Sequence, residues 1–356
     1  MSGAVETEDR VIVGITMGDI NGVGPELIVR IFSDPRMAQV CTPVIYGASK
    51  VLSFYKKALN NTEFNFTTIK SENEIVEKRT NVINCWDEEL KIEPGKSSTD
   101  GGKYAFTALQ HACKHLAEGF IDVLVTGPID KKTMQQDGFR FPGHTEFLAQ
   151  QFPSGEHLMV LTSEQLRVAT VTGHIPVKDV SSALSSEKII SKIKAFHNTL
   201  KRDFGIGKPR IAVLGLNPHS GDNGLIGNEE QNIIMPAIKS TFEQGLTVYG
   251  PYGADGFFGS SAYKSFDGVL AMYHDQGLIP FKTLAFESGV NFTAGLPIIR
   301  TSPDHGTAYD IAGKGLASED SLRCAIYMAC DIAHRRASFD EASANPLKFS
   351  KLSGDR

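Results

Sequence analysis

Short apolar runs alternate with longer amphipathic stretches along most of the chain. Most of the runs are continuously apolar, which is typical of strands that are covered on both faces of a sheet. We expect strands at Val11–Thr16, Pro43–Tyr46, Asp122–Thr126, Leu158–Thr162, Arg167–Thr172, Arg210–Leu216 and Gly268–Met272.

Helical periods fill several of the intervals between these runs. Thr99 is a candidate N-cap for a helix that continues to Leu116. Similar periods predict helices over Glu187–Phe204 and Asn228–Gln244. This alternation of strands and helices predicts an α/β fold with a largely parallel sheet.

Several predicted strands end in polar or glycine-rich segments, namely ITMGD, LVTGP, TVTGH, LGLNPH and MYHD. In open α/β sheets, ligands bind just outside the carboxyl ends of the strands. The sequence therefore predicts a functional site at these strand ends.

Composition narrows the class of protein. The chain has 356 residues, of which 41% are hydrophobic and 22% charged, as expected of a globular protein with one large or two ordinary domains. The net charge of −5 gives no overall attraction for nucleic acid or an anionic membrane. No apolar stretch approaches the roughly 20 residues of a membrane-spanning helix.

The five cysteines are scattered, odd in number and without a C-x-x-C pair. This pattern argues against a disulfide scaffold or a cysteine zinc site, and it predicts a cytoplasmic protein. The first ten residues, MSGAVETEDR, lack the apolar segment of a signal peptide, which agrees with that expectation.

Three histidines follow three of the apolar runs: His174, His219 and His274. If these strands meet at one edge of a cleft, the imidazoles can bind a divalent cation and leave positions open for a substrate. Asp275 is one of the carboxylates that can orient them. The alternative is that each histidine is a hydrogen-bonded structural residue, and spacing alone does not decide between the two.

Basic and hydroxyl side chains add a candidate anion site. His144 and Thr145 stand at a predicted helix start, where backbone N–H groups and a hydroxyl suit a phosphate. Arg300 can bind a carboxylate or phosphate through two hydrogen bonds, and Lys282 can supply a point charge or a titrating amine. The simpler alternatives are that Thr145 caps the helix and that Arg300 and Lys282 form surface ion pairs.

The familiar nucleotide-binding motifs are absent from the sequence. GDINGVG is not G-x-G-x-x-G, and EPGKSS has Leu90 where a P-loop requires its first glycine. A standard Rossmann dehydrogenase and a P-loop kinase are both disfavoured.

Seven segments, taken together, resemble the 4-hydroxythreonine-4-phosphate dehydrogenase family. They span about Val11 to Leu316 in the family's order: ITMGDINGVGPEL, VTGPIDKKTM, FPGHTEFLA, TGHIPVKDV, LGLNPHSGDNGLIGNEE, YHDQGLIPFK and VNFTAGLPIIRTSPDHGTAYDIAGKG. The resemblance implies an isocitrate/isopropylmalate dehydrogenase-like fold, with two α/β/α domains and a cleft between them. It also implies a homodimer with an active site shared between subunits, and NAD or NADP bound without the Rossmann glycines.

On this basis we expect a discontinuous first domain of residues 1–130 plus 303–356. Residues 131–302 would form a second domain that carries most of the metal and substrate residues and the dimer interface. The implied reaction is the oxidation of 4-phosphohydroxy-L-threonine to 2-amino-3-oxo-4-phosphooxybutanoate. This product loses CO2 to give 3-amino-2-oxopropyl phosphate, on a route to pyridoxal phosphate.

The resemblance also implies roles for individual residues. One divalent cation (Zn, Mg or Co) would be held by His174, His219 and His274, with at least one ligand from the partner subunit. The substrate-binding residues would be His144, Thr145, Lys282, Asn291 and Arg300. The cofactor loop would include His305, Gly306, Thr307 and Asp310. Asp275 and Lys282 are the candidate catalytic bases.

Two alternatives stay open at this point. Met17 and Asp19 stand where the family usually has proline and glutamate, which bears on the substrate pocket. A sister group with nearly the same motifs oxidises four-carbon sugar acids such as threonate or erythronate 4-phosphate. A metal-dependent hydrolase is the competing class, because three histidines and a cation also suit water activation.

Overall fold

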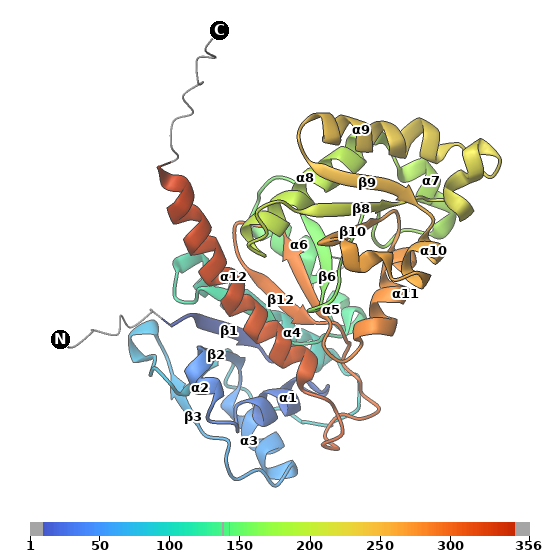
Figure 1. Ribbon diagram of the computed structural model, residues 1–356. Coiled ribbons are helices and arrows are strands. Elements are labelled where there is room, and N and C mark those ends of the chain that lie inside the picture. Colours follow the sequence, from blue (N-terminus) through green and yellow to red (C-terminus); the bar gives the residue numbers. More distant parts are fainter. Residues whose placement is uncertain (1–9, 137–138, 142, 346–356) are drawn as a thin grey trace.

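The structure is a computed structural model that describes residues 10–136, 139–141 and 143–345. It is built on one long β-sheet with helices packed along it, and Figure 1 shows the two ends of that sheet in two separate lobes. The predicted α/β class is confirmed.

Within the described residues, twelve strands form this sheet in the order β3-β4-β2-β1-β5-β12-β11-β6-β7-β10-β8-β9. Their bounds are β1 Ile12–Thr16, β2 Thr42–Gly47, β3 Phe66–Ile69, β4 Thr80–Asn84, β5 Val123–Thr126, β6 Leu158–Thr162, β7 Arg167–Thr170, β8 Arg210–Leu214, β9 Thr247–Tyr252, β10 Gly268–Ala271, β11 Val290–Ala294 and β12 Arg300–Pro303. All seven predicted strands are present. The sequence patterns missed β3, β4, β9, β11 and β12.

The sheet contains two parallel blocks that run in opposite directions. The first block is β3, β4, β2, β1, β5 and β12, and the second block is β7, β10, β8 and β9. Between them, β11 and β6 pair with each other and with their outer neighbours in antiparallel register. The middle of the molecule is therefore a short antiparallel segment that joins the two blocks.

The helices are α1 Gly24–Ile31, α2 Met37–Val40, α3 Ser49–Ala58, α4 Thr99–Glu118, α5 Lys131–Gln136, α6 His144–Gln151, α7 Val180–Ala183, α8 Ser186–Arg202, α9 Met235–Glu243, α10 Ala254–Gly259, α11 His274–Ala285 and α12 Asp320–Ala344. Short 3₁₀ turns occur at η1 Glu72–Glu74, η2 Val177–Asp179, η3 Pro218–Gly224 and η5 Ala262–Ser265, and η4 Glu230–Ile234 is a π-helical turn.

Several predicted boundaries need correction. The N-cap of α4 is Ser98 rather than Thr99, because the Ser98 hydroxyl accepts the Gly101 N–H at 3.0 Å. The single helix expected over Asn228–Gln244 is a π-helical turn followed by α9. Strands β7 and β8 each end two residues before their predicted ends, although single backbone hydrogen bonds to neighbouring strands continue at Val171, Thr172 and Gly215.

The middle strands have two chemically different faces. Along β12, Arg300 and Ser302 alternate with Thr301, whose hydroxyl donates to a backbone carbonyl of α12 at 2.8 Å. Register places Asn291 of β11 beside Ser302, on the face opposite α12. One face is thus covered by α12, and the other presents polar side chains.

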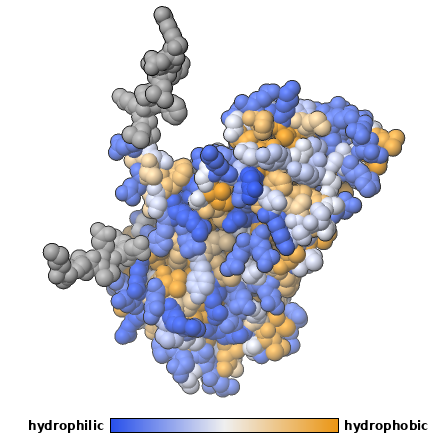
Figure 2. All heavy atoms as spheres, viewed as in Figure 1, coloured by the Kyte–Doolittle hydropathy of each residue, from blue (hydrophilic) through white to orange (hydrophobic). Residues whose placement is uncertain are grey.

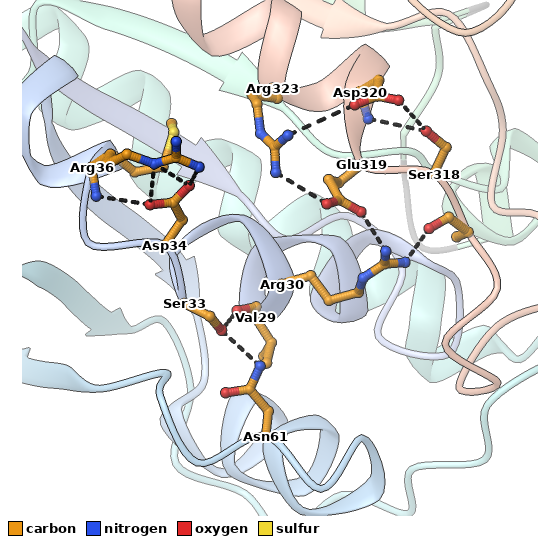
Figure 3. Close-up of polar contacts among 12 residues, drawn as sticks. Val29, Arg30, Ser33, Asp34, Arg36, Asn61, Ser318, Glu319, Asp320 and Arg323 are labelled. Atoms are coloured by element: carbon orange, nitrogen blue, oxygen red, sulfur yellow. Dashed lines mark hydrogen bonds and ion pairs between the residues drawn. The ribbon is translucent and has the colours of Figure 1, made fainter.

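The chain returns to the first block through α12, and charged contacts fix the start of this helix. Arg30 on α1 pairs with Glu319 at 2.5 Å, and Arg323 pairs with Glu319 at 3.0 Å and with Asp320 at 3.7 Å (Figure 3). Each partly exposed pair contributes about 1 kcal/mol or less, but the shared carboxylate links α1 to α12.

No helix in the described ranges has both the length and the apolar character required to cross a bilayer.

Candidate functional site

A cavity of about 580 Å³ lies over the polar face of the middle strands. Strand β12 contributes Arg300 and Ser302, β11 contributes Asn291, and β6 contributes Met159 and Leu161 to its walls. The ends of β5 and β7, the helices α5, α6 and α11, and the segment after β12 also contribute to the lining. The cavity therefore extends from the carboxyl ends of the first block to those of the second block.

Arg300 forms one wall of the cavity and is 3% exposed. Its Nε and Nη2 atoms donate to the Thr126 hydroxyl at 3.0 and 2.6 Å, and Nη1 donates to the Thr293 hydroxyl at 3.1 Å. Burial lowers the pKa of the guanidinium to about 10, so it remains charged near neutral pH. A buried cation of this kind is well suited to an anionic ligand.

His144 supplies the neutral partner of Arg300. Its Nδ1 atom lies 3.1 Å from Arg300 Nη2, and the pKa of His144 is held well below its usual value by burial first and then by the charges of Arg300 and Lys131. His144 is the first residue of α6, with Gly143 at the N-cap. Thr145 is therefore inside the helix and is not its cap.

Thr145 follows one step along α6 and continues the same polar wall. Its hydroxyl lies 3.4 Å from that of Thr293, which also contacts Arg300. The two N-terminal residues of α6 thus meet the hydroxyl and guanidinium groups of the middle strands. This arrangement combines hydroxyl donors, a helix start and one cation, as a phosphate or carboxylate requires.

Lys282 lines the cavity from α11. Its Nζ atom lies 3.2 Å from Asp304 Oδ1, and it donates to the Asp304 carbonyl at 3.4 Å. Burial raises the pKa of Asp304, although the Lys282 charge opposes this shift. Lys282 therefore does form an ion pair, as the alternative to a ligand-binding role required, but this pair lies in the cavity wall rather than on an outer surface.

His174 and His274 come together at the second-block end of the cavity. Their ring centroids are 5.4 Å apart, at 43° to one another. Burial, Lys131 and His274 lower the pKa of His174, which favours its neutral, metal-binding form. His274 Nδ1 lies 2.7 Å from Asp275 Oδ1, a contact that leaves Nε2 of His274 for a cation.

His219 does not join this pair within one chain. It is exposed in η3 and lines a different depression, together with Tyr252 and Asp255. Among residues 10–136, 139–141 and 143–345, no three side chains of the metal-binding types meet in one place. A single subunit therefore presents two neighbouring imidazoles, which fit part of a cation site, and a third ligand would have to come from elsewhere.

The residues expected to bind the cofactor begin at the rim of the cavity. His305 and Gly306 line it, and His305 Nδ1 is 2.9 Å from the Gly306 carbonyl. Nδ1 must donate to that carbonyl, so the second ring nitrogen, Nε2, is left for another partner, and in the described part of the protein it is buried without one. Thr307 and Asp310 lie outside the lining, and the Thr307 carbonyl accepts the Val23 N–H at 3.0 Å.

Asn291, on the polar face of the middle strands, also has a buried polar atom without a partner among the described residues. Its Oδ1 atom is buried, and the described residues provide no hydrogen-bond partner for it. A buried polar atom without a partner is uncommon in native proteins. Asn291 Oδ1 and His305 Nε2 are therefore two polar atoms available to a ligand that carries hydroxyl or amine groups.

Four residues of the site were missed by sequence reasoning: Thr126, Lys131, Thr293 and Asp304. Thr126 belongs to the strand-end segment LVTGP, which was noted without a role for its threonine. Lys131 lines the cavity from the start of α5. Thr293 and Asp304 lie in or beside strands that the pattern did not predict, so no signal singled them out.

Comparison with known proteins identifies the family of this chain. Residues 39–329 match the family described as Pyridoxal phosphate biosynthetic protein PdxA. A protein from Bacteroides thetaiotaomicron named 4-hydroxythreonine-4-phosphate dehydrogenase is 54% identical, over 96% of this chain and 94% of its own length. The crystal structure of 4-hydroxythreonine-4-phosphate dehydrogenase from Klebsiella pneumoniae aligns with a TM-score of 0.79 and 36% identity, covering 91% of this chain and 98% of that one.

A third relative carries a different substrate name. A protein from Oceanobacillus iheyensis with the provisional name D-threonate 4-phosphate dehydrogenase is 40% identical, over 90% of this chain and 98% of its own length. All three relatives are named dehydrogenases, which favours that class over the metal-dependent hydrolase. The chain therefore belongs to the pyridoxal phosphate biosynthetic protein PdxA family.

Proposed function

We propose that the protein oxidises 4-phosphohydroxy-L-threonine at C3 with NAD or NADP, in the presence of one divalent cation. The product, 2-amino-3-oxo-4-phosphooxybutanoate, is a β-keto acid that loses CO2 to give 3-amino-2-oxopropyl phosphate. This reaction would serve the formation of pyridoxal phosphate.

One observation carries the proposal: a single cavity holds both a desolvated anion-binding group and a pair of neighbouring imidazoles. Arg300 and His144 lie at one part of its wall, and His174 and His274 lie at another. A four-carbon acid with a terminal phosphate needs both of these features, one for its charged end and one beside its reacting hydroxyl. The volume of about 580 Å³ leaves room for a cofactor ring as well.

His174 and His274 of one subunit would hold the cation, and His219 of the partner subunit would complete the set. The nucleotide would be held by His305, Gly306, Thr307 and Asp310. The buried Nε2 atom of His305, which has no hydrogen-bond partner among the described residues, is consistent with this role. When bound, the cation supplies Lewis acidity toward the substrate hydroxyl, and the nicotinamide supplies a hydride acceptor. The proposal covers Zn, Mg or Co as the cation.

The protein's own residues would fix the substrate in the reactive orientation. Arg300 and the Nε2–H of neutral His144 would bind one anionic group, with help from the Thr145 hydroxyl. Asn291 Oδ1 would accept a hydrogen bond from the substrate amine or from a hydroxyl. Orienting the reacting carbon against the cofactor is a large part of catalysis in such a site.

Two residues are candidates for the base that removes the hydroxyl proton. Asp275 is not part of the cavity lining, and its carboxylate is engaged with His274 Nδ1. Lys282 lines the cavity. We therefore favour Lys282 as the base and assign Asp275 to the orientation of His274.

We also propose a homodimer whose subunits meet near His219. Large apolar side chains are exposed on η2 and just after η3, with Val177 at 73% and Leu225 at 81% exposure. Figure 2 shows hydrophobic residues at the outer tip of the second block on the visible face. Such side chains are typical of an interface core.

The division into residues 1–130 plus 303–356 and residues 131–302 remains our proposal for the two domains. It is consistent with the contacts of α12 to α1. The cavity, which both parts line, would then be the interdomain cleft.

D-threonate 4-phosphate is the second candidate substrate, favoured by the Oceanobacillus iheyensis relative. It carries a hydroxyl in place of the amine, so Asn291 Oδ1 would meet a hydroxyl instead. Turnover of both substrates with NAD and with NADP, followed by the near-ultraviolet absorbance of reduced nicotinamide, separates the candidates. Preferential turnover of 4-phosphohydroxy-L-threonine supports the proposal, and preferential turnover of D-threonate 4-phosphate contradicts it.

A further inference from the structure

We infer that Glu230 is a positioning residue for the cation site, because its buried carboxylate holds the strained turn that carries His219. The inference rests on the proposed function in one respect, namely that His219 is a cation ligand. It concerns how this chain prepares that ligand.

The backbone has a positive φ at six consecutive residues that begin with His219. The φ angles are His219 52°, Ser220 52°, Gly221 80°, Asp222 43°, Asn223 56° and Gly224 95°. A left-handed conformation costs an L-residue roughly 1–2 kcal/mol, and it is normally found at single positions. A run of this length persists only if the surrounding structure fixes it, and such strain concentrates at functional sites.

Glu230 is the group that fixes the entrance to this turn. It is 2% exposed, and its Oε1 atom accepts the backbone N–H groups of Leu216 and Asn217, both at 2.7 Å. Its Oε2 atom accepts from Asn217 Nδ2 at 3.0 Å. A buried carboxylate is stable only when it is hydrogen-bonded, and these bonds go to residues two and three positions before His219.

The neighbouring Glu229 also holds Asn217 in place. Its Oε2 atom accepts from Asn217 Nδ2 at 2.8 Å, and its Oε1 atom accepts from the Ser181 hydroxyl at 2.7 Å. Both glutamates therefore hold Asn217. They come from the beginning of the π-helical turn, a local irregularity that is often found at functional sites.

Gly221 packs directly against the Glu230 carboxylate. A Cβ atom at this position would lie 2.6 Å from Glu230 Oε2, in addition to the strain of φ +80°. The left-handed turn thus leaves no room for a side chain beside the carboxylate, so a substitution at Gly221 must displace the turn or the Glu230 carboxylate.

The same loop is tied to the helix that begins at His274. Gln276 donates from Nε2 to the Gly215 carbonyl at 2.6 Å, and its Oε1 atom accepts the Met272 N–H at 2.7 Å. Glu230 therefore acts on a loop whose base is already fixed to α11 of its own subunit, while the proposed cation site that His219 completes belongs to the partner subunit. Glu230 then determines the direction in which the turn presents His219.

Co²⁺ binding to the full-length chain tests the inference, because the visible absorption of bound Co²⁺ reports the number and geometry of its ligands. Glu230→Gln keeps the side-chain size but places an amide donor against donors of Asn217. We expect Co²⁺ to bind 10–100-fold more weakly and with an altered visible spectrum at saturation. Glu243→Gln, which removes an exposed glutamate paired with Lys239 at 3.9 Å, should bind Co²⁺ as the wild type does.

A second pair of variants covers the case in which Glu230→Gln does not fold. Gly221→Ala disturbs the turn and leaves the carboxylate in place. Gly245→Ala has a similar positive φ of 87°, but a Cβ atom there has no neighbour within 4 Å. We expect only Gly221→Ala to weaken Co²⁺ binding, although both substitutions carry the backbone strain.

His219→Ala separates failure of the inference from failure of the proposed site. If His219→Ala binds Co²⁺ like the wild type, His219 is not a ligand, and the assignment falls together with the inference. If His219→Ala loses affinity while Glu230→Gln and Gly221→Ala bind within twofold of the wild type, only the inference is overturned. Weakened binding in all three, with normal binding in both controls, confirms it.

Discussion

Arg300 and His144 form a directed pair in which the arginine donates to Nδ1 of the histidine, at 3.1 Å from Nη2. Arginine has no acceptor, so this hydrogen bond requires a lone pair on Nδ1 and places the proton of neutral His144 on Nε2. The wall of the cavity therefore contains one positive charge and one neutral donor.

Because His144 is held neutral in the folded protein, we expect it to contribute to the pH dependence of the free energy of unfolding. Burial and Arg300 lower the pKa of His144 in the folded state, so between the two pKa values the unfolded chain binds more protons. This contribution to stability is complete above the unfolded pKa of about 6.5 and is lost as pH falls toward the folded pKa. His144→Asn keeps an acceptor and cannot titrate.

We expect His144→Asn to lose less unfolding free energy than the wild type between about pH 8 and about pH 5, as measured by chemical denaturation. A residual slope remains in both proteins, because the lowered pKa of His174 acts with the same sign. Identical pH profiles would show that His144 is not held neutral.

Arg300→Lys tests whether the guanidinium binds the substrate anion. Lysine keeps the charge, but its single nitrogen has only three donors and cannot replace the planar guanidinium that contacts Thr126, Thr293 and His144 as well as an anion. A hydrogen bond to a charged group contributes about 1.5–3 kcal/mol, so we expect the specificity constant kcat/KM to fall at least tenfold. Arg36→Lys, in an exposed pair with Asp34 at 2.6 Å, is the control. Unchanged kinetics in Arg300→Lys would remove Arg300 from the substrate site.

Thr126→Val tests how the buried guanidinium is stabilised. The variant keeps the side-chain shape but removes the acceptor of two Arg300 N–H groups. We expect the free energy of unfolding to fall by about 1–3 kcal/mol, because buried donors are left without a partner. Thr68→Val, on an exposed position of β3, should change it by less than about 0.5 kcal/mol. Equal effects at the two positions would argue against this account.

Asp275→Asn separates orientation of a ligand from proton transfer. An asparagine oxygen can still accept from His274 Nδ1, but it no longer strengthens the imidazole as a ligand. We expect cation affinity, measured by calorimetry, to fall about tenfold and turnover to recover at saturating cation. Turnover that stays abolished at saturating cation would point to Asp275 as the base instead of Lys282.

The sequence predicted the apolar part of the sheet and missed its polar part. Strand β6 was predicted with its observed bounds because every one of its residues except Thr162 is apolar. Strands β11 and β12 were missed because polar residues interrupt the apolar pattern: Asn291, Arg300 and Ser302, which line the cavity, and the buried Thr293. The signal that defines a buried strand is lost where a strand carries the site.

The candidate site was likewise predicted only in part. His174 and His274 follow neighbouring parallel strands, and the expected meeting of these two rings is confirmed. His219 follows β8 in the same manner, but its left-handed turn carries it into another depression. That turn depends on Glu230, eleven residues further along the chain, and no local pattern indicates the contact.

The central claim is that one cavity performs a cation-dependent oxidation of a small phosphorylated acid. The most direct test is the reaction of cation-stripped enzyme with 4-phosphohydroxy-L-threonine and nicotinamide cofactor, before and after a divalent cation is restored. The account predicts equal amounts of reduced nicotinamide and CO2, formed only after the cation returns. Release of inorganic phosphate without reduced nicotinamide, or turnover indifferent to the cation, would contradict it.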